Sequence, residues 1–228
     1  MYESLEVCYL DEPFKLSIKD FPLNKVYVID DWLSKELHLK YFERTSQPKI
    51  WAQNNQVQSE DGTGLPYHLF WGSTFLREGQ IRDGGLNPID CFFTEYLNDR
   101  LQTEFGFEWV RFDYAGMNGQ TQGLHGTIHS DCQNDDSYNI SFLYYTNPYW
   151  NPHWGGQLRF YNDFNYGKNG EDDWSKEHQS AEVDFKPNRL LMFDGRIPHG
   201  ADAPLPRAKY MCRQSLVIRG SEAQLCQQ

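Results

Sequence analysis

Three residues, His129, Asp131 and His199, constrain this chain more than any other pattern in its sequence. One residue separates His129 from Asp131, and His199 follows 68 positions later in the segment Arg-Ile-Pro-His-Gly. Two imidazoles and one carboxylate can occupy one triangular face of a metal ion and leave its other positions open. Side chains at i and i+2 of a strand point to the same side, so His129 and Asp131 suit one ion. The intervening chain must then fold back to deliver His199.

Short strands after residue 106 can make this return. We expect strands over about 107–115, 124–131, 138–146, 156–162, 181–185, 189–194 and 208–218. Turn residues separate them, at Asn118-Gly119, Asn147-Pro148, Gly155-Gly156, Lys186-Pro187-Asn188 and Asp194-Gly195. Several short strands with this spacing indicate a sandwich or a barrel. The polar segment 163–178 is an insertion that acts either as a lid or as a solvated loop.

The first hundred residues predict a smaller number of supporting elements. Residues 26–33 form an expected strand, after which Ser34 caps a helix over about 35–45. Residues 46–66 are polar and predict a loop, and 67–76 predict a strand. A second helix is expected over about 88–105, with Pro88 in its first turn. The predicted fold class is therefore mainly β, with N-terminal α-helices that support it.

Composition limits the number of domains and the classes of partner. The length of 228 residues predicts a single domain, residues 1–228, with a β core over about 107–219. A net charge of −11 without a basic cluster argues against a nucleic-acid partner, and no apolar stretch is long enough for a membrane span. Five cysteines without a C-x-x-C pair, and an N-terminus without a signal peptide, predict a cytoplasmic protein.

Three segments resemble the prolyl-hydroxylase-like 2-oxoglutarate and Fe(II)-dependent dioxygenases. Residues 138–162 show a tyrosine-rich strand, an Asn, a Trp and then Gly-Gly-x-Leu. Residues 185–199 and the opening segment 28–34 are also similar to this family, and the resemblance covers roughly 26–219. It implies a double-stranded β-helix, or jelly roll, which agrees with the strands expected from the sequence pattern.

The resemblance also implies a metal site and its cofactors. The catalytic metal ligands of the family fall on His129, Asp131 and His199. A carboxylate at 131, where some relatives have a small residue and admit a halide, implies hydroxylation and not halogenation. The implied cofactors are Fe(II), 2-oxoglutarate as cosubstrate and dioxygen, with ascorbate as an additional reductant that the family allows.

The distal carboxylate of 2-oxoglutarate requires a fixed cation. Arg213 and Ser215 share one strand face and fit the Arg-x-Ser pattern of the family, although Arg213 follows His199 by 14 residues, a few more than is common. Arg207 is the competing arginine, and we favour Arg213 because Arg207 lies beside prolines. Tyr145 matches the strand tyrosine that binds the same carboxylate, whereas Tyr114 is either a second pocket tyrosine or a core aromatic.

The function expected from the resemblance is hydroxylation of an unactivated C–H bond. A prolyl residue of a peptide or protein is the leading substrate, and a free amino acid or another small metabolite is the alternative. A non-enzymatic jelly-roll module that binds a metal or ligand is the alternative from another class. A zinc hydrolase with the same ligands ranks lower because the sequence lacks an H-E-x-x-H helix. The oligomeric state stays open.

Overall fold

Two β-sheets form most of the computed structural model, which describes residues 5–11, 21–46, 52–56, 69–77, 96–97, 99–100, 103, 110–126, 128–132, 139–161 and 179–222. Within these residues, the large sheet has the order β1 (Glu6–Tyr9), β2 (Lys25–Ile29), β9 (Leu190–Asp194), β6 (Asn139–Tyr145), β11 (Arg213–Glu222), β5 (Val110–Gln120), β4 (Leu69–Arg77) and β3 (Ala52–Gln56). The small sheet has the order β10 (His199–Ala201), β7 (Leu158–Tyr161) and β8 (Gln179–Val183). All described pairs are antiparallel except β1 with β2.

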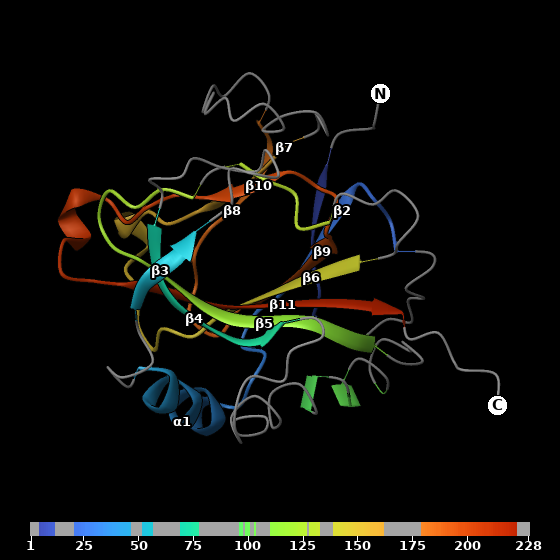
Figure 1. Ribbon diagram of the computed structural model, residues 1–228, viewed down its shortest axis with the longest axis horizontal. Helices are drawn as coiled ribbons and strands as arrows, with labels where there is room; N and C mark the ends of the chain where they lie inside the picture. The colour runs from blue at the N-terminus through green and yellow to red at the C-terminus, as the bar shows by residue number, and fades with distance from the viewer. Residues whose placement is uncertain are drawn as a thin grey trace.

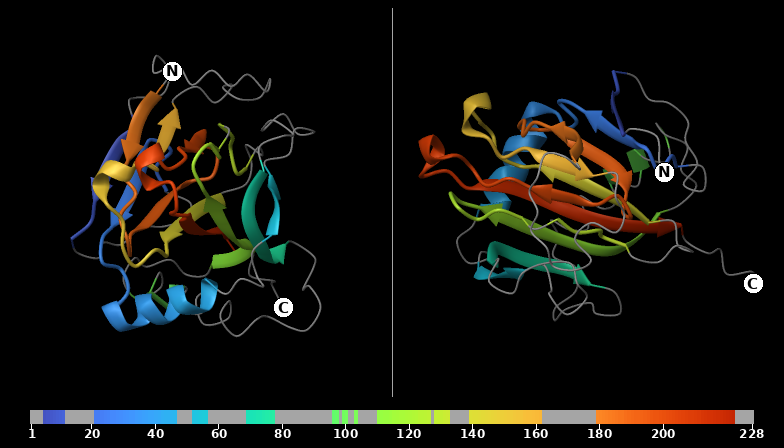
Figure 2. Two further views of the ribbon diagram at one scale, coloured as in Figure 1. Left: turned by 90° about the vertical axis from the view of Figure 1, so that its left-hand side faces the viewer. Right: turned by 90° about the horizontal axis from the view of Figure 1, so that it is seen from above.

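The large sheet is covered on both faces. Helix α1 (Lys35–Thr45) lies against one face, and the small sheet lies over the other (Figure 1). Figure 2 shows the same arrangement after rotation, with α1 again beneath the large sheet. Each face has its own hydrophobic cluster, so strands such as β6 and β9 are buried on both sides. Such strands read as continuous apolar runs, as Leu190–Asp194 does.

Strand β6 shows how alternation assigns side chains to the two layers. Phe142 and Tyr144 pack in the cluster beneath the helix, whereas Leu143 and Tyr145 pack in the cluster between the sheets. Opposite Tyr145, the partner strand β11 places Ser215. The face of β6 that carries Tyr145 therefore looks into the space between the sheets.

The expected fold class is confirmed, because a mainly β jelly-roll arrangement with an N-terminal helix is present. Ser34 caps α1, and its side-chain oxygen accepts a hydrogen bond from the backbone of Leu37 at 3.3 Å. Of the second expected helix, residues 96–97, 99–100 and 103 are helical, and the rest of 88–105 lies outside the described residues. The insertion 163–178 also lies outside them, and the assignment of one domain stays a prediction.

Four expectations about secondary structure are wrong. Of the strand expected over 124–131, the described residues 124–126 and 128–131 form no strand. Instead, the segment pairs with β10 only locally, through Gly126 and through the isolated bridge between His129 and His199. The Asn118-Gly119 pair is not a turn, because it lies inside β5, where both neighbouring strands pair with it. Part of the expected loop 46–66 forms β3, and β11 begins five residues later than expected, after the short turn η3 (Pro206–Ala208).

Two general features complete the description. Among the described residues, no helix is long and apolar enough to cross a membrane. The described cysteines Cys8 and Cys212 are free thiols.

Candidate metal centre and anion pocket

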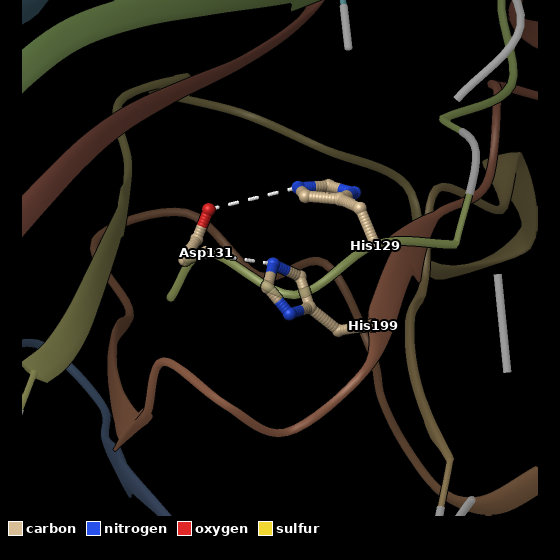
Figure 3. Close-up of side chains that lie close together, drawn as sticks. All are labelled: His129, Asp131 and His199. Carbon is tan, nitrogen blue, oxygen red and sulfur yellow. Dashed lines mark ion pairs between the residues drawn. The ribbon is translucent and has the colours of Figure 1, made fainter. Parts of the chain in front are cut away.

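His129, Asp131 and His199 converge at the edge of the space between the sheets. Their ligand atoms all lie within 4.8 Å of one another. Nε2 of His129 lies 3.7 Å from Oδ1 of Asp131, and Nε2 of His199 lies 3.5 Å from Oδ2 (Figure 3). The backbones of the two histidines exchange hydrogen bonds of 3.0 and 2.9 Å, which fixes His129 beside β10. The backbone bridge therefore brings together residues that are far apart in sequence.

The carboxylate of Asp131 is held by two further side chains. Oδ1 accepts from Nη2 of Arg219 at 2.7 Å, and Oδ2 accepts from the Ser141 hydroxyl at 2.6 Å. Burial alone would raise the pKa of the Asp131 carboxyl, but the Arg219 guanidinium and the two imidazoles hold that pKa well below its usual range. Asp131 is therefore an anion at neutral pH, as a metal ligand has to be.

His199 is prepared to act as a neutral ligand. Its Nδ1–H donates to the Ile197 carbonyl at 2.9 Å, which directs the lone pair of Nε2 towards Asp131. Burial lowers the pKa of His199 to about 4. A neutral imidazole with one nitrogen anchored and the other directed inward is the usual form of a metal-binding histidine. The donor set of two imidazoles and one carboxylate therefore fits Fe(II).

A buried guanidinium lies on the same face of the large sheet. Arg213, the first residue of β11, is only 1% exposed. Its Nε donates to the Gly156 carbonyl at 2.8 Å, and its Nη1 donates to the side-chain oxygen of Gln120 at 3.0 Å. The rings of Tyr145 and Phe185 each lie 4.9 Å from its Cζ atom. These neutral contacts fix the guanidinium without cancelling its charge.

Two hydrogen-bond donors at Arg213 have no acceptor among the described residues. Among the described residues, no carboxylate lies within ion-pair distance of Arg213, and neither its Nη2 nor the Tyr145 hydroxyl has a hydrogen-bond partner. Burial raises the pKa of Tyr145, so the phenol keeps its proton. A buried cation without a counter-charge is costly. A bound carboxylate, accepting from Arg213 and Tyr145, would remove that cost.

The other predicted residues have distinct positions. The Ser215 hydroxyl lies 3.4 Å from Nη1 of Arg213, as expected for the Arg-x-Ser pattern. Tyr114 is not at Arg213, and its ring instead lies 4.9 Å from the Cζ atom of Arg219. Arg207 is exposed in η3, so it does not compete with Arg213 for a buried anion.

Sequence reasoning missed three contacts of this site. Gln120 and Gly156 both accept hydrogen bonds from Arg213, and Arg219 contacts Asp131. The signal for Arg219 was present, because it lies on the same face of the strand as Arg213 and Ser215. Gln120 gives no signal, because the Asn118-Gly119 pair before it predicts a turn.

A family model described as the 2OG-Fe(II) oxygenase superfamily matches residues 114–215. This range contains the three candidate metal ligands together with Arg213 and Tyr145. Over this range, which is less than half of the 228 residues, the chain is similar to the 2OG-Fe(II) oxygenase superfamily. The match and the His-Asp-His cluster support a 2-oxoglutarate-dependent dioxygenase with the expected cofactors Fe(II), 2-oxoglutarate and dioxygen. A search of curated protein sequences returned no significant match.

Solved structures of three prolyl hydroxylases share the fold at low sequence identity. One is a prolyl hydroxylase from Trichoplax adhaerens in complex with a peptide of the hypoxia-inducible factor oxygen degradation domain. Its sequence is 20% identical and its TM-score is 0.52, and the match covers 86% of this chain and 83% of that chain. A Pseudomonas putida prolyl-4-hydroxylase is 18% identical with a TM-score of 0.51, over 87% and 92% of the two chains. A viral collagen prolyl hydroxylase from Paramecium Bursaria Chlorella virus-1 is 10% identical with a TM-score of 0.50, over 87% and 96%.

Proposed function

We propose that this oxygenase hydroxylates an unactivated C–H bond and that the metal centre and the Arg213 pocket are its active site. In this proposal His129, Asp131 and His199 hold Fe(II), while Arg213, Tyr145 and Ser215 bind the distal carboxylate of 2-oxoglutarate. The observation that carries the proposal is the fully buried Arg213, which has donors to spare and no carboxylate partner among the described residues. Tyr114 lies beside Arg219 and is not assigned to 2-oxoglutarate.

Each protein group has a defined task at this site. When bound, Fe(II) with 2-oxoglutarate and dioxygen supplies the oxidation of the C–H bond, and succinate and carbon dioxide are released. His199 stays neutral through its bond to Ile197, and Asp131 stays ionised beside Arg219 and Ser141. Arg213 is held in place by neutral partners, so its charge is available to the cosubstrate.

The layered fold keeps both ends of the cosubstrate site rigid. Arg213 and Arg219 project from β11, Tyr145 and Ser141 from β6, and His199 from β10. Strand β11 lies between β6 and β5 in the middle of the large sheet, and β10 belongs to the sheet that covers it. His129 and Asp131 lie outside the strands, but the other groups proposed to contact metal and cosubstrate are fixed by strands, which hold functional side chains more precisely than loops do.

A prolyl residue of a peptide or protein is the leading substrate. Support comes from the three similar structures, which are prolyl hydroxylases, one of them with a bound peptide. A free amino acid or another small metabolite is the alternative. Incubation with proline-rich peptides and with free proline, followed by mass spectrometry for the addition of one oxygen atom, separates these two substrate classes.

Succinate formation tests the proposed function itself. We expect the wild type, supplied with Fe(II) and 2-oxoglutarate in air, to release succinate slowly even without its substrate. Arg213→Ala should raise the KM for 2-oxoglutarate by roughly 100-fold, because loss of a buried charge pair costs about 2–5 kcal/mol. Arg207→Ala removes an equal charge from an exposed turn and should leave the KM unchanged. Absence of succinate from the wild type would instead favour a non-enzymatic binding module.

A further inference from the structure

Arg219 is a second cation on the pocket-facing side of β11. It lies on the same face as Arg213, opposite Tyr114 on β5 and Ser141 on β6. Its side chain is 33% exposed, whereas Arg213 is 1% exposed. One guanidinium nitrogen contacts Asp131 at 2.7 Å, and the Tyr114 ring supports the other side of the group. Arg219 is therefore both in contact with a candidate metal ligand and accessible to solvent.

When the site holds Fe(II) and 2-oxoglutarate, the positive charge of Arg219 is not balanced by the other charges of the site. With Fe(II) and the 2-oxoglutarate dianion bound, the charges of Fe(II), Asp131, Arg213 and 2-oxoglutarate cancel, because the two histidines are neutral ligands. The nearby Asp202 is already paired with Arg159 at 2.6 Å. The positive charge of Arg219 then remains without a balancing anion among the described residues. A partly desolvated site with one surplus positive charge attracts an anionic ligand.

Arg219 also has donors that Asp131 does not use. A guanidinium has five N–H donors, and the 2.7 Å contact with Asp131 is made by Nη2. Nε of Arg219 is buried and has no hydrogen-bond partner among the described residues. A role limited to holding Asp131 would use neither the exposed part of the Arg219 side chain nor its Nε–H donor.

We propose that Arg219 binds a carboxylate of the primary substrate and so selects substrates that carry an acid close to the oxidised C–H bond. This inference rests on the proposed function, because it takes the space beside Asp131 as the substrate position. Arginine suits the role because its planar group can bind a second carboxylate while it keeps its contact with Asp131. A free amino acid and a peptide with an acidic residue next to the target share this chemistry.

Matched acid and amide ligands test the selection. The first pair is L-proline and L-prolinamide, and the second is a short peptide with aspartate beside its proline and the same peptide with asparagine. Binding is measured by calorimetry on protein loaded with Zn(II) and 2-oxoglutarate, which binds but does not turn over. We expect the wild type to bind the acid of at least one pair roughly tenfold more tightly than the amide, since a hydrogen bond to a charged acceptor is stronger than one to a neutral acceptor. The pair that shows the preference identifies the source of the carboxylate.

Three variants separate the role of Arg219 from general effects. Arg219→Gln should lose the preference for the acid, Arg219→Lys should keep part of it, and Arg207→Gln should keep all of it. Because Arg219 also contacts Asp131, the affinities of Arg219→Gln for Zn(II) and 2-oxoglutarate are measured first, and acid and amide are compared at concentrations that saturate this variant. Equal binding of acid and amide by the wild type in both pairs, including undetectable binding of all four ligands, overturns the inference. So does an acid preference that survives in Arg219→Gln.

Failure of the proposed function gives a different result. In that case the wild type loaded with Zn(II) would not bind 2-oxoglutarate at all, and Arg213→Ala would change nothing. A wild type that binds 2-oxoglutarate through Arg213 but discriminates no acid from amide leaves the function intact and rejects only the role of Arg219.

Discussion

At the scale of single residues, Gly156 determines whether Arg213 can occupy its pocket. The backbone of Gly156 has a φ of +88°, and a Cβ atom there would lie 3.1 Å from Cδ of Arg213. Gly123 has a similar φ of +85°, but a Cβ atom there would meet nothing within 4 Å. The two positions therefore share the backbone strain of a left-handed residue and differ in the contacts of the added Cβ, which at position 156 are a tight one with Arg213 and an ordinary one with Trp150 at 3.5 Å.

This difference predicts separate outcomes for two alanine variants. Gly123→Ala should cost about 1 kcal/mol of folding stability through strain and leave the affinity for 2-oxoglutarate unchanged. Gly156→Ala should lose at least as much stability and also weaken 2-oxoglutarate binding by roughly tenfold, because the arginine must shift. Thermal melting and calorimetry measure the two effects. Equal 2-oxoglutarate affinity in the two variants would show that Gly156 does not position Arg213.

Adjacent tyrosines on β6 offer a second matched pair. Tyr145 faces Arg213, whereas Tyr144 faces helix α1 and lies 2.5 Å from Nδ1 of His38. Tyr145→Phe should weaken 2-oxoglutarate binding by roughly tenfold or more, since it removes a hydrogen bond to a charged group. Tyr144→Phe should instead lower stability and leave the dissociation constant of 2-oxoglutarate unchanged. Calorimetry measures the affinity for 2-oxoglutarate, and denaturant titration measures the stability of both variants. Weaker 2-oxoglutarate binding in Tyr144→Phe with unchanged binding in Tyr145→Phe would contradict the faces of β6 to which the two tyrosines are assigned.

Sequence reasoning found the residues of this site that have a simple spacing. The short separation of His129 and Asp131, and the alternation of Arg213 with Ser215, were sufficient to select them. The reason given for His129 and Asp131 was only partly right, since a single backbone bridge to His199 replaces the expected strand. Residues that act through partners distant in sequence, such as Gln120, carry no local signature.

At the scale of elements, helix α1 is attached to the strand ends that carry Arg213. Nε2–H of His38 donates to the backbone carbonyl of Asn147 at 3.0 Å. The Asn147 side chain donates to the Cys212 carbonyl at 2.9 Å and accepts from the Gln214 backbone at 2.7 Å. These are the two neighbours of Arg213. The helix, the end of β6 and the start of β11 thus form one hydrogen-bonded unit.

The burial of His38 predicts a pH dependence of stability. Desolvation lowers the pKa of His38 from its ordinary value of 6.5, so the folded chain binds this proton less readily than the unfolded chain. The stability associated with neutral His38 is present above about pH 6.5 and is lost as the pH falls through the lowered pKa. His38→Gln should be less stable than the wild type at pH 8, and the difference should shrink towards pH 5. Denaturant melts of both metal-free proteins at these pH values measure it, and a constant difference would contradict the prediction.

Element prediction succeeded where local patterns agree with tertiary contacts. Ser34 and the apolar spacing after it located α1, and the alternation in 138–146 located β6. It failed at Asn118-Gly119, a pair with strong turn preference, because pairing with β4 and β11 on both sides overrides that preference. The strand β3 is rich in Asn and Gln, so its existence depends on pairing with β4 and not on its own composition.

At the scale of the whole molecule, the two layers bring distant segments of the chain to one site. The large sheet supplies Arg213, Tyr145 and Arg219, and the small sheet supplies His199. Asp131 lies between them with its carboxylate in contact with β6 and β11 side chains. Folding of the whole jelly roll is therefore required before metal and cosubstrate can bind together, and no isolated segment contains the site.

The most direct test of this account is the absorption spectrum of the protein with Fe(II) and 2-oxoglutarate in the absence of oxygen. We predict a weak visible charge-transfer band in the wild type, since iron and cosubstrate bind side by side. The band should be absent from His199→Ala, which loses a metal ligand, and from Arg213→Ala at cosubstrate concentrations that saturate the wild type. It should be retained in Arg207→Ala. A wild type without the band, or a band that survives in His199→Ala, would contradict the proposed site.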